Sequence, residues 1–580
     1  MHPASHAAAN RPCSAGACAP PTAATQSLQA GILARRSRGH CRHGAPGRAR
    51  LLAAAVALAL AAGCTGGGPG ARPRPGAAAP PGVGGTLAIA LLDPGSLDPA
   101  RADRLEDQIV VGNLFDGLTT LDAAGAVRPA VAASWTSDPG LRRWEFHLRP
   151  DARWADGSPV RAEDFKFAWE RLADPKAKPA PSPSAALLAP VAGFRALAAG
   201  RARSLSGVQA PDATTLVVQL ERPLADFPAL AASVQLSPLP RALAAADPAG
   251  YLARPVGDGP FRLAGRYRPG HALTLERNPA YTGAAARLDK VSVHVVPDEL
   301  TAWLELQQGR VAFAPVPLDQ VAAAGAVHGV SADGRSRPGL LQGPMLATWE
   351  VGFDRRAGPA SDPSWRQGFS LAIDRARIAA ALAGAAAPAT GLVPPGMPAA
   401  GTAPACAACA HDPARARALL AKVRGGRGPV TLRIPADGVD RRIADLLAAD
   451  LAAAGVKLQL KVSNQAAGAP VAAGTEVAAY PRMAAVLDRF SSRAAANPTS
   501  PVDPTVDQLL DQAAATADEP ARAGRYRQAE AAILADLPIA PVLALRQSAV
   551  LAAGVEGFDL TPWGTVDLAA VTVSSGRSGG

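Results

Sequence analysis

The side chains that do chemistry in enzymes are present in this chain, but they do not form the patterns that catalysis uses. Its 580 residues include nine His, six Cys and 48 acidic side chains. No zinc-binding His-Glu-x-x-His and no phosphate-binding Gly-x-x-x-x-Gly-Lys occurs. His147 falls on the polar side of an expected strand, and His411 lies beside a cysteine pair. We therefore predict that the chain is not an enzyme and has no cofactor; a secreted hydrolase is the remaining enzymatic alternative.

The first 64 residues have the composition of an export signal. They contain seven Arg and no Asp or Glu, and 51–62 is an unbroken apolar run. That run is too short to cross a bilayer as a stable helix, whereas a basic stretch followed by a short apolar segment and small residues is typical of a signal peptide. Removing the seven Arg leaves 52 basic residues against 48 acidic ones, so most of the net charge of +11 belongs to the signal. No basic patch with interleaved aromatic residues remains, so nucleic-acid binding is not expected.

The end of this signal resembles a bacterial lipoprotein processing site. Ala61-Ala62-Gly63 precedes Cys64, and Leu60 stands one position earlier than the Leu usual in such sites. The resemblance implies that Cys64 is diacylated and becomes the first residue, which would anchor the protein on the extracytoplasmic face of the membrane. A plain cleaved signal with an incidental cysteine is the alternative. Residues 65–84 contain seven Gly and five Pro and are predicted to be a tether.

Only one cysteine pair remains in the rest of the chain. The other four cysteines lie in the export segment: Cys13, Cys18, Cys41 and Cys64. In an exported protein, a remaining Cys406-x-x-Cys409 pair favours a local disulfide. A redox-active pair or half of a zinc site stays as an alternative, although no second pair is present.

The elements that would position a site alternate between strands and helices. Trp144, Phe146 and Leu148 alternate with polar residues, which predicts a half-buried strand, and 165–172 places apolar residues on one helical face. An amphipathic helix ending near Gly455 and a strand over 456–462 follow the same logic. The alternation predicts a mixed α/β fold. Nearly 490 residues after the tether exceed what one core usually supports, so two lobes are expected.

An ordered series of segments resembles the peptide-type (oligopeptide- and dipeptide-binding) extracytoplasmic solute-binding proteins of bacterial ABC importers. The segments that carry the resemblance are 97–99, 113–122, 144–149, 154–160, 163–175, 255–261, 275–281, 366–375, 392–396, 412–413 and 537–541. The resemblance implies an α/β, two-lobed, periplasmic-binding-protein-like clamp with mixed sheets and a hinge. The implied organisation is a signal peptide at 1–64, a tether at 65–84, a first lobe at 85–310 with a subdomain at about 129–205, a second lobe at 311–530 and a return to the first lobe at 531–580.

Ligand contacts follow from the resemblance only where the sequence aligns. In the first lobe they are the loop Asp93-Pro94-Gly95, whose Pro lacks an N–H for backbone pairing, and Ser184. In the second lobe, peptide binders commonly carry a Trp-x-x-Asp-Tyr segment whose Asp pairs with the peptide amine. Here the aligned candidates are Glu476, Val477, Ala479 and Tyr480: Ala479 replaces the Asp, and Glu476 is a candidate substitute carboxylate.

The resemblance implies a monomeric, lipid-anchored substrate-binding protein that passes peptides or peptide-like solutes to the permease and ATPase subunits of an ABC transporter. Two alternatives remain with the same clamp. One is a specialised binder of a non-peptide solute such as a glycan, opine, siderophore or metal chelate. The other is a surface receptor or sensor that no longer serves a transporter.

Overall fold

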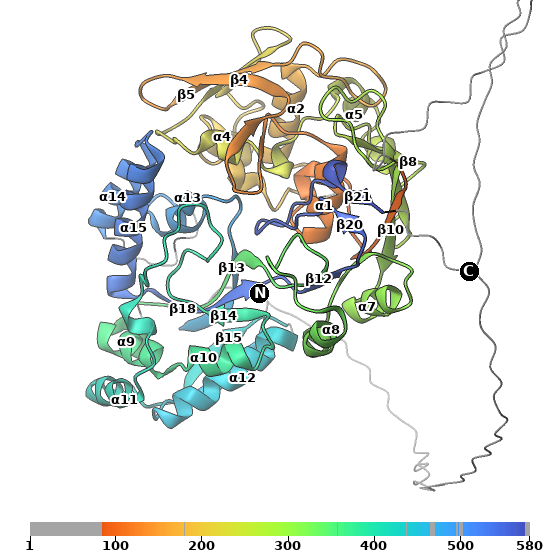
Figure 1. Cartoon of the computed structure of the whole chain (residues 1–580). Helices are drawn as coiled ribbons and strands as arrows, with labels where there is room; N and C mark the ends of the chain where they lie inside the picture. Colours follow the sequence, from red (N-terminus) through yellow and green to blue (C-terminus); the bar gives the residue numbers. More distant parts are fainter. Residues whose placement is uncertain are drawn as a thin grey trace, which may run out of the picture. The chain divides into compact units, whose positions relative to one another are not determined.

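The structure, a computed structural model, describes residues 84–574 apart from 179, 357, 437, 464–469, 495–496 and 498–502. Cys64, the signal peptide and all of the tether except Gly84 lie outside the described residues. The described chain is mixed α/β with several sheets, which confirms the predicted class (Figure 1). The bounds predicted for the two lobes stay a prediction.

The largest sheet has seven strands and combines distant parts of the sequence. Its central strand β1 pairs in parallel with β10 and β11, and β9 continues the sheet antiparallel to β10. In spatial order the strands are β12 (Gly339–Leu341), β19 (Ala549–Leu551), β11 (Phe313–Pro315), β1 (Thr86–Leu92), β10 (Lys290–Val296), β9 (Leu273–Arg277) and β8 (Phe261–Ala264). β19 therefore brings the C-terminal part of the chain back into the sheet of β1, where it pairs with β11 and β12.

A four-stranded antiparallel sheet shares its core with the seven-stranded sheet. Its order is β4 (Ala132–Ser137), β5 (Arg143–Leu148), β7 (Thr215–Gln219) and β6 (Val208–Gln209). Trp144, Phe146 and Leu148 of β5 are buried, which confirms the predicted alternation. Helix α2 (Ala162–Ala173) buries its apolar face, and its Trp169 indole donates a hydrogen bond to the Leu236 carbonyl at 2.9 Å. These aromatic side chains form core, as predicted.

A six-stranded sheet, built from the chain between β12 and β19, has a core of its own. The spatial order is β14 (Ala386–Pro388), β18 (Ile539–Arg546), β13 (Pro344–Phe353), β17 (Val471–Val477), β15 (Val430–Ile434) and β16 (Leu458–Val462). Trp349, Val351 and Phe353 of β13 pack with α9 (Pro363–Ala372) and α12 (Gly438–Ala453). The sequence predicted both α12, which ends before Gly455, and the strand β16.

Helices pack against both the six-stranded and the seven-stranded sheet. Helices α13 (Met483–Leu487), α14 (Pro504–Ala514) and α15 (Glu519–Asp536) form a further cluster with Leu346 of β13, and α7 (Glu299–Gln307) and α8 (Val321–His328) cover part of the seven-stranded sheet. The remaining helices are α1 (Leu105–Leu114), α3 (Phe194–Ala198), α4 (Phe227–Leu230), α5 (Arg241–Ala246), α6 (Pro248–Ala253), α10 (Arg375–Ala380) and α11 (Pro413–Lys422). Short 3-10 helices are η1 (Pro99–Arg101), η2 (Ala185–Leu188), η3 (Val234–Leu236), η4 (Leu318–Gln320), η5 (Pro359–Ser361), η6 (Ala407–Cys409), η7 (Asp488–Phe490) and η8 (Leu568–Ala570), and two-stranded ribbons are β2 (Thr119–Leu121) with β3 (Val127–Pro129) and β20 (Val555–Glu556) with β21 (Thr572–Val573).

The chain passes twice between the seven-stranded and six-stranded sheets, and the two passages lie side by side. The first joins β12 to β13 through Gln342-Gly343, and the second joins β18 to β19 through Gln547-Ser548. The Gln547 amide N–H donates to the Gly343 carbonyl at 2.9 Å, and the Gln547 side chain donates to the Thr561 carbonyl at 2.9 Å. Everything between 344 and 546 is therefore tethered to the rest of the described chain by two adjacent strand connections.

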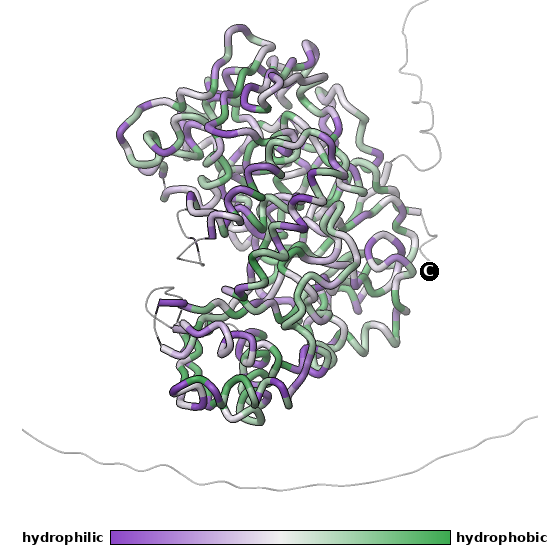
Figure 2. The backbone as a smooth tube through the Cα atoms, turned by 90° about the vertical axis from the view of Figure 1, so that its left-hand side faces the viewer, coloured by the Kyte–Doolittle hydropathy of each residue, from purple (hydrophilic) through white to green (hydrophobic). Residues whose placement is uncertain are grey.

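None of the described helices combines the length and the apolar character that a membrane span requires. Hydrophobic and hydrophilic stretches are interspersed along the chain tube (Figure 2).

Candidate functional site

The loop after β1 is held in place by the side chain of Asp93. Its carboxylate accepts hydrogen bonds from the Gly95 amide at 3.0 Å, the Tyr267 hydroxyl at 3.1 Å and the Gly270 amide at 2.7 Å. Pro94 is buried, and Gly95 is exposed with a φ of 65°. All of these partners belong to the region of the seven-stranded sheet. The Asp93 carboxylate therefore shapes this loop through bonds within its own part of the molecule.

The segment that contains Ser184 lies against the continuation of this loop. Ser182 Oγ donates to the Ala100 carbonyl at 2.5 Å and accepts a bond from the Ser184 amide at 3.1 Å. Fully buried Asp98 pairs with Arg171 of α2 close by. The cavity here, lined in part by Ala100 and Ser182, has a volume of about 10 Å³. That is room for about one water molecule, so it is no pocket for a solute.

The candidates of the six-stranded sheet lie at the end of β17. Glu476 stands directly opposite Thr348 of β13, and residues opposite each other in a strand pair share a face. Glu350 lies two positions along β13 and so shares that face as well. Val477 is 60% exposed and Ala479 is exposed. Ala479 places no charge at the position where peptide binders commonly carry an Asp.

Glu476 has a cationic partner that the sequence did not indicate. Arg489 of η7 lies 3.1 Å from Glu476, measured from Nη1 to Oε2, and donates two hydrogen bonds to Glu350 at 2.8 and 2.7 Å. The guanidinium carbon also lies 4.7 Å from the centre of the Phe490 ring. Burial raises the pKa of the Glu476 carboxyl, Arg489 lowers it and Glu350 raises it further. Glu350 and Arg489 are 139 positions apart, and no spacing in the sequence links them.

Tyr480 packs between two hydrophobic clusters. Its ring is half-buried and contacts both the shared core of the seven- and four-stranded sheets and the cluster of α13 to α15. Burial raises the pKa of its hydroxyl well above the ordinary value, and nearby Asp488 and Asp226 raise it further. Among the described residues, no hydrogen bond or ion pair joins the 93–96 loop to 476–480. The two groups of candidates are therefore not joined into one polar site in this part of the chain.

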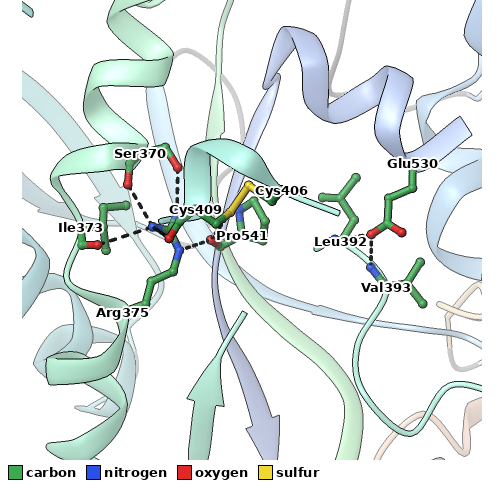
Figure 3. The surroundings of a disulfide bond; sticks show 9 residues. All are labelled: Ser370, Ile373, Arg375, Leu392, Val393, Cys406, Cys409, Glu530 and Pro541. Atoms are coloured by element: carbon green, nitrogen blue, oxygen red, sulfur yellow. Dashed lines mark hydrogen bonds between the residues drawn. A yellow bond between two sulfur atoms is a disulfide. The ribbon is translucent and has the colours of Figure 1, made fainter. Parts of the chain in front are cut away.

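Cys406 and Cys409 are joined by a disulfide, with Cα atoms 5.3 Å apart (Figure 3). One buried charged residue, Arg375, binds the turn, and another, Glu530, binds the segment 392–393 near it. Arg375 donates to the carbonyls of Cys409 at 3.0 Å and Pro541 at 2.8 Å, and Glu530 accepts from the amides of Leu392 and Val393 at 2.7 and 3.0 Å. A neighbouring cavity of about 300 Å³ is lined largely by alanines of this turn and of α15. Across the described part of the chain, no group of three or more His, Cys, Asp or Glu residues is placed to hold a metal ion.

With this geometry, the chain can be compared with known proteins. The family model of the bacterial extracellular solute-binding proteins, family 5, matches residues 126–502. The chain is 34% identical over 310 residues to the probable deoxycholate-binding periplasmic protein YgiS of Escherichia coli (strain K12), covering 52% of this chain and 56% of that protein. It is 32% identical over 293 residues to the periplasmic murein peptide-binding protein MppA of the same organism, covering 49% and 51%. The matched region thus spans about half the length of these curated relatives.

The fold agrees over a longer stretch. The unliganded open form of the murein tripeptide-binding protein MppA superposes with a TM-score of 0.71 at 26% identity, covering 85% of this chain and 99% of that one. The fold and the matches define an extracytoplasmic solute-binding protein, which is a binding protein and not an enzyme. The chain belongs to the bacterial extracellular solute-binding proteins, family 5.

Proposed function

We propose that this protein is the lipid-anchored substrate-binding component of an ABC importer, and that it captures peptides or peptide-like solutes outside the cytoplasm. The proposal rests on the family and on the similarity to a murein peptide-binding protein. The structural observation that carries it is the pair of adjacent connections at Gln342-Gly343 and Gln547-Ser548. Two parts whose only covalent links are adjacent strand connections can rotate about them, and a solute bound between the parts would favour closure. The closed, loaded form would then be delivered to the membrane permease.

We place ligand recognition on the face of β13 and β17 that carries Glu350 and Glu476. Two carboxylates share one guanidinium there, which leaves a net charge of about −1. Because Glu350 engages Arg489 through two hydrogen bonds, Glu476 retains its other oxygen for a cationic group of the ligand. The Thr348 hydroxyl is buried on this face and has no hydrogen-bond partner among the described residues. These features support the binding of an ammonium or amide group of the solute near Glu476. Glu476 would then take the role of the Asp that Ala479 replaces.

Native mass spectrometry of the protein secreted as a Cys64→Ser variant tests this proposal. A ladder of retained masses that differ by amino-acid residues would support peptide capture. In Glu476→Gln the fraction of protein that retains ligand should fall, because the substitution removes the net negative charge of the group formed by Glu350, Glu476 and Arg489. Glu556→Gln, at the exposed residue of β20, is the matched control and should retain as much ligand as the parent. Equal retention in both variants would exclude Glu476 as a ligand contact.

A specialised non-peptide solute is the second candidate. It is favoured by the uncharged Ala479, by the engagement of Glu476 with Arg489 and by the similarity to a protein described as probably deoxycholate-binding. A single discrete adduct mass in the same experiment would select it over general peptide capture. A bare protein would count against solute capture and favour a surface receptor.

The lipid anchor needs a separate experiment, because Cys64 lies outside the described residues. Metabolic labelling with a palmitate analogue should label the parent protein and not Cys64→Ser, and the variant should appear in the medium. A parent protein that is processed without incorporating label would contradict the anchor while leaving solute binding untouched.

A further inference from the structure

A buried cluster of charges joins the region of the four-stranded sheet to the helices beside the six-stranded sheet. Asp226, just before α4, lies 3.1 Å from Arg522 Nε of α15 and 3.5 Å from Arg482 Nε, which precedes α13. The three residues are only 4%, 8% and 7% exposed. Each arginine is also fixed from within the chain: Arg522 donates to the Thr516 and Ala517 carbonyls at 3.0 and 2.8 Å. The cluster is therefore a defined contact and not a chance approach of surface charges.

The same contact continues through a second ion pair and through the backbone. Arg222 pairs with Asp488, both about a quarter exposed. The Ala225 amide donates to the Ala514 carbonyl at 2.9 Å. The Arg482 side chain donates to the Gly125 carbonyl, also at 2.9 Å. In each case one partner belongs to residues 125–226 and the other to residues 482–522, which are linked covalently only through the two strand connections described above.

This interface is rich in charged and polar groups, as expected of a contact that forms and separates. Interfaces that never open are mainly apolar, because nothing then has to be rehydrated. Here ionic partners occupy both sides, and four buried polar atoms lack a hydrogen bond among the described residues: Arg222 Nη1, Arg482 Nε, Asp488 Oδ1 and Tyr526 Oη. Such groups regain water when the two sides part, and buried ion pairs contribute little net stability when formed. The two states of this interface should therefore be close in free energy.

We infer that Asp226, Arg482 and Arg522, together with Arg222 and Asp488, form a latch that bridges the two parts in the ligand-free protein and sets how often they separate. Figure 1 shows α4 next to the α13–α15 group, whereas the two strand connections join β12 to β13 and β18 to β19. The inference rests on the proposed rotation about those connections, but it involves no ligand. It differs from ligand-driven closure because its strength is set by the chain's own charges and by salt.

Distance measurements between spin labels test the latch without any ligand. In the protein that lacks residues 1–64, exposed Ser204 and exposed Gln459 of β16 are changed to Cys and labelled; the two native cysteines that remain, Cys406 and Cys409, are in the disulfide. Arg222→Asp and Asp488→Arg should each raise the population of longer distances about three- to fivefold, the factor expected for a partly exposed pair. The double variant Arg222→Asp/Asp488→Arg, which restores the pair with reversed charges, should return the distribution to that of the parent.

Two controls keep the result interpretable. Asp511→Asn removes an ion pair with Arg493 that lies wholly on one side of the contact, and it should leave the distances unchanged. Asp226→Asn provides a milder change at the buried cluster and should also lengthen the distances, more so at low salt. The latch is refuted if the single charge reversals leave the distribution of a folded protein unchanged, or if the double reversal fails to restore it. Because no ligand is present, either result leaves the proposed solute capture to its own experiment.

Discussion

Arg489 binds Glu350 through two nearly equal hydrogen bonds, at 2.8 and 2.7 Å, on the same face of the sheet where Glu476 approaches it more loosely at 3.1 Å. The side chains of Arg489 and Glu350 are 17% and 11% exposed, whereas that of Glu476 is 40% exposed. The two carboxylates therefore have different tasks. Glu350 positions the guanidinium, and Glu476 remains accessible.

This asymmetry predicts unequal effects of two matched substitutions. Glu350→Gln should lower the free energy of unfolding by about 1–3 kcal/mol, because it leaves a nearly buried charge without its main partner. Glu476→Gln should cost under about 1 kcal/mol, because its exposed side of the pair is screened by solvent. Urea unfolding at neutral pH measures both. Equal losses would contradict the assignment of Glu350 as the positioning residue.

A pair of acidic residues near the end of α1 predicts a pH dependence of stability. The Asp116 amide donates to Asp258 Oδ1 at 3.0 Å, Asp258 is buried and its Oδ2 has no partner among the described residues. Burial raises the pKa of Asp116 to about 6, and burial together with Asp116 raises that of Asp258 well above its ordinary value. An acid with a raised pKa in the folded state binds its proton more tightly there than in the unfolded chain. Its contribution is therefore present at low pH and is lost as the pH rises from about 4 through the folded pKa.

Asp258→Asn should remove the loss of folding stability that Asp258 causes as the pH rises. The variant should become more stable than the parent as the pH rises from about 4, by about 1–3 kcal/mol near pH 7, since each unit of pKa shift corresponds to about 1.4 kcal/mol. Urea midpoints between pH 4 and 8 provide the measurement. Asp122→Asn is the control: the pKa of Asp122 is lowered mainly by Arg128, so its replacement should show no gain that grows with pH. A parallel pH profile for Asp258→Asn and the parent would contradict the prediction.

The Gly257-Asp258-Gly259 turn predicts a severe effect of one methyl group. A Cβ at Gly257 would lie 1.8 Å from the Leu114 carbonyl oxygen, and this is backbone that cannot rotate away. Gly257→Ala should therefore destabilise the protein by about 1–3 kcal/mol or more, as overpacking does. Gly438→Ala is the matched control, because no atom lies within 4 Å of its Cβ position. Thermal unfolding should separate the two variants clearly; similar melting temperatures would mean that the turn relaxes.

Removing the disulfide should lower the stability of the fold only modestly. Cys406 and Cys409 are three positions apart, so the closed loop is very short and the chain-entropy contribution is about 2 kcal/mol. The Cys406→Ser/Cys409→Ser variant should lose about that much stability and keep its fold, since Arg375 still binds the backbone of the turn and Glu530 still binds the segment 392–393. Hydrogen exchange should speed up at the amides of Ala405 and residue 406, which bond the Thr390 carbonyl, while the Leu392 and Val393 amides stay protected by Glu530. A complete loss of folding would show that the disulfide, and not the buried charges, organises this region.

Local structure could be derived from the sequence because its causes are local. The alternation in β5, the helical face of α2 and the cap of α11, where Asp412 accepts from the Arg415 amide at 2.9 Å, depend on residues a few positions apart. The family could be derived as well, because an ordered series of turn and core segments is specific even where each one is weak.

The face proposed for ligand binding and the contacts that hold it were decided only by the tertiary structure. The sequence singled out Glu476 but not Arg489 or Glu350, since a charge in a list of residues does not reveal which strand or helix will bring its partner. The same holds for Asp226, whose arginine partners come from α15 and from the segment before α13. Sequence by itself determined the elements and the class of protein through short-range periodicity, turns and motif order. Which charges meet was set by long-range packing, because ion pairs form wherever folding brings two side chains within a few ångströms and carry no fixed spacing along the chain.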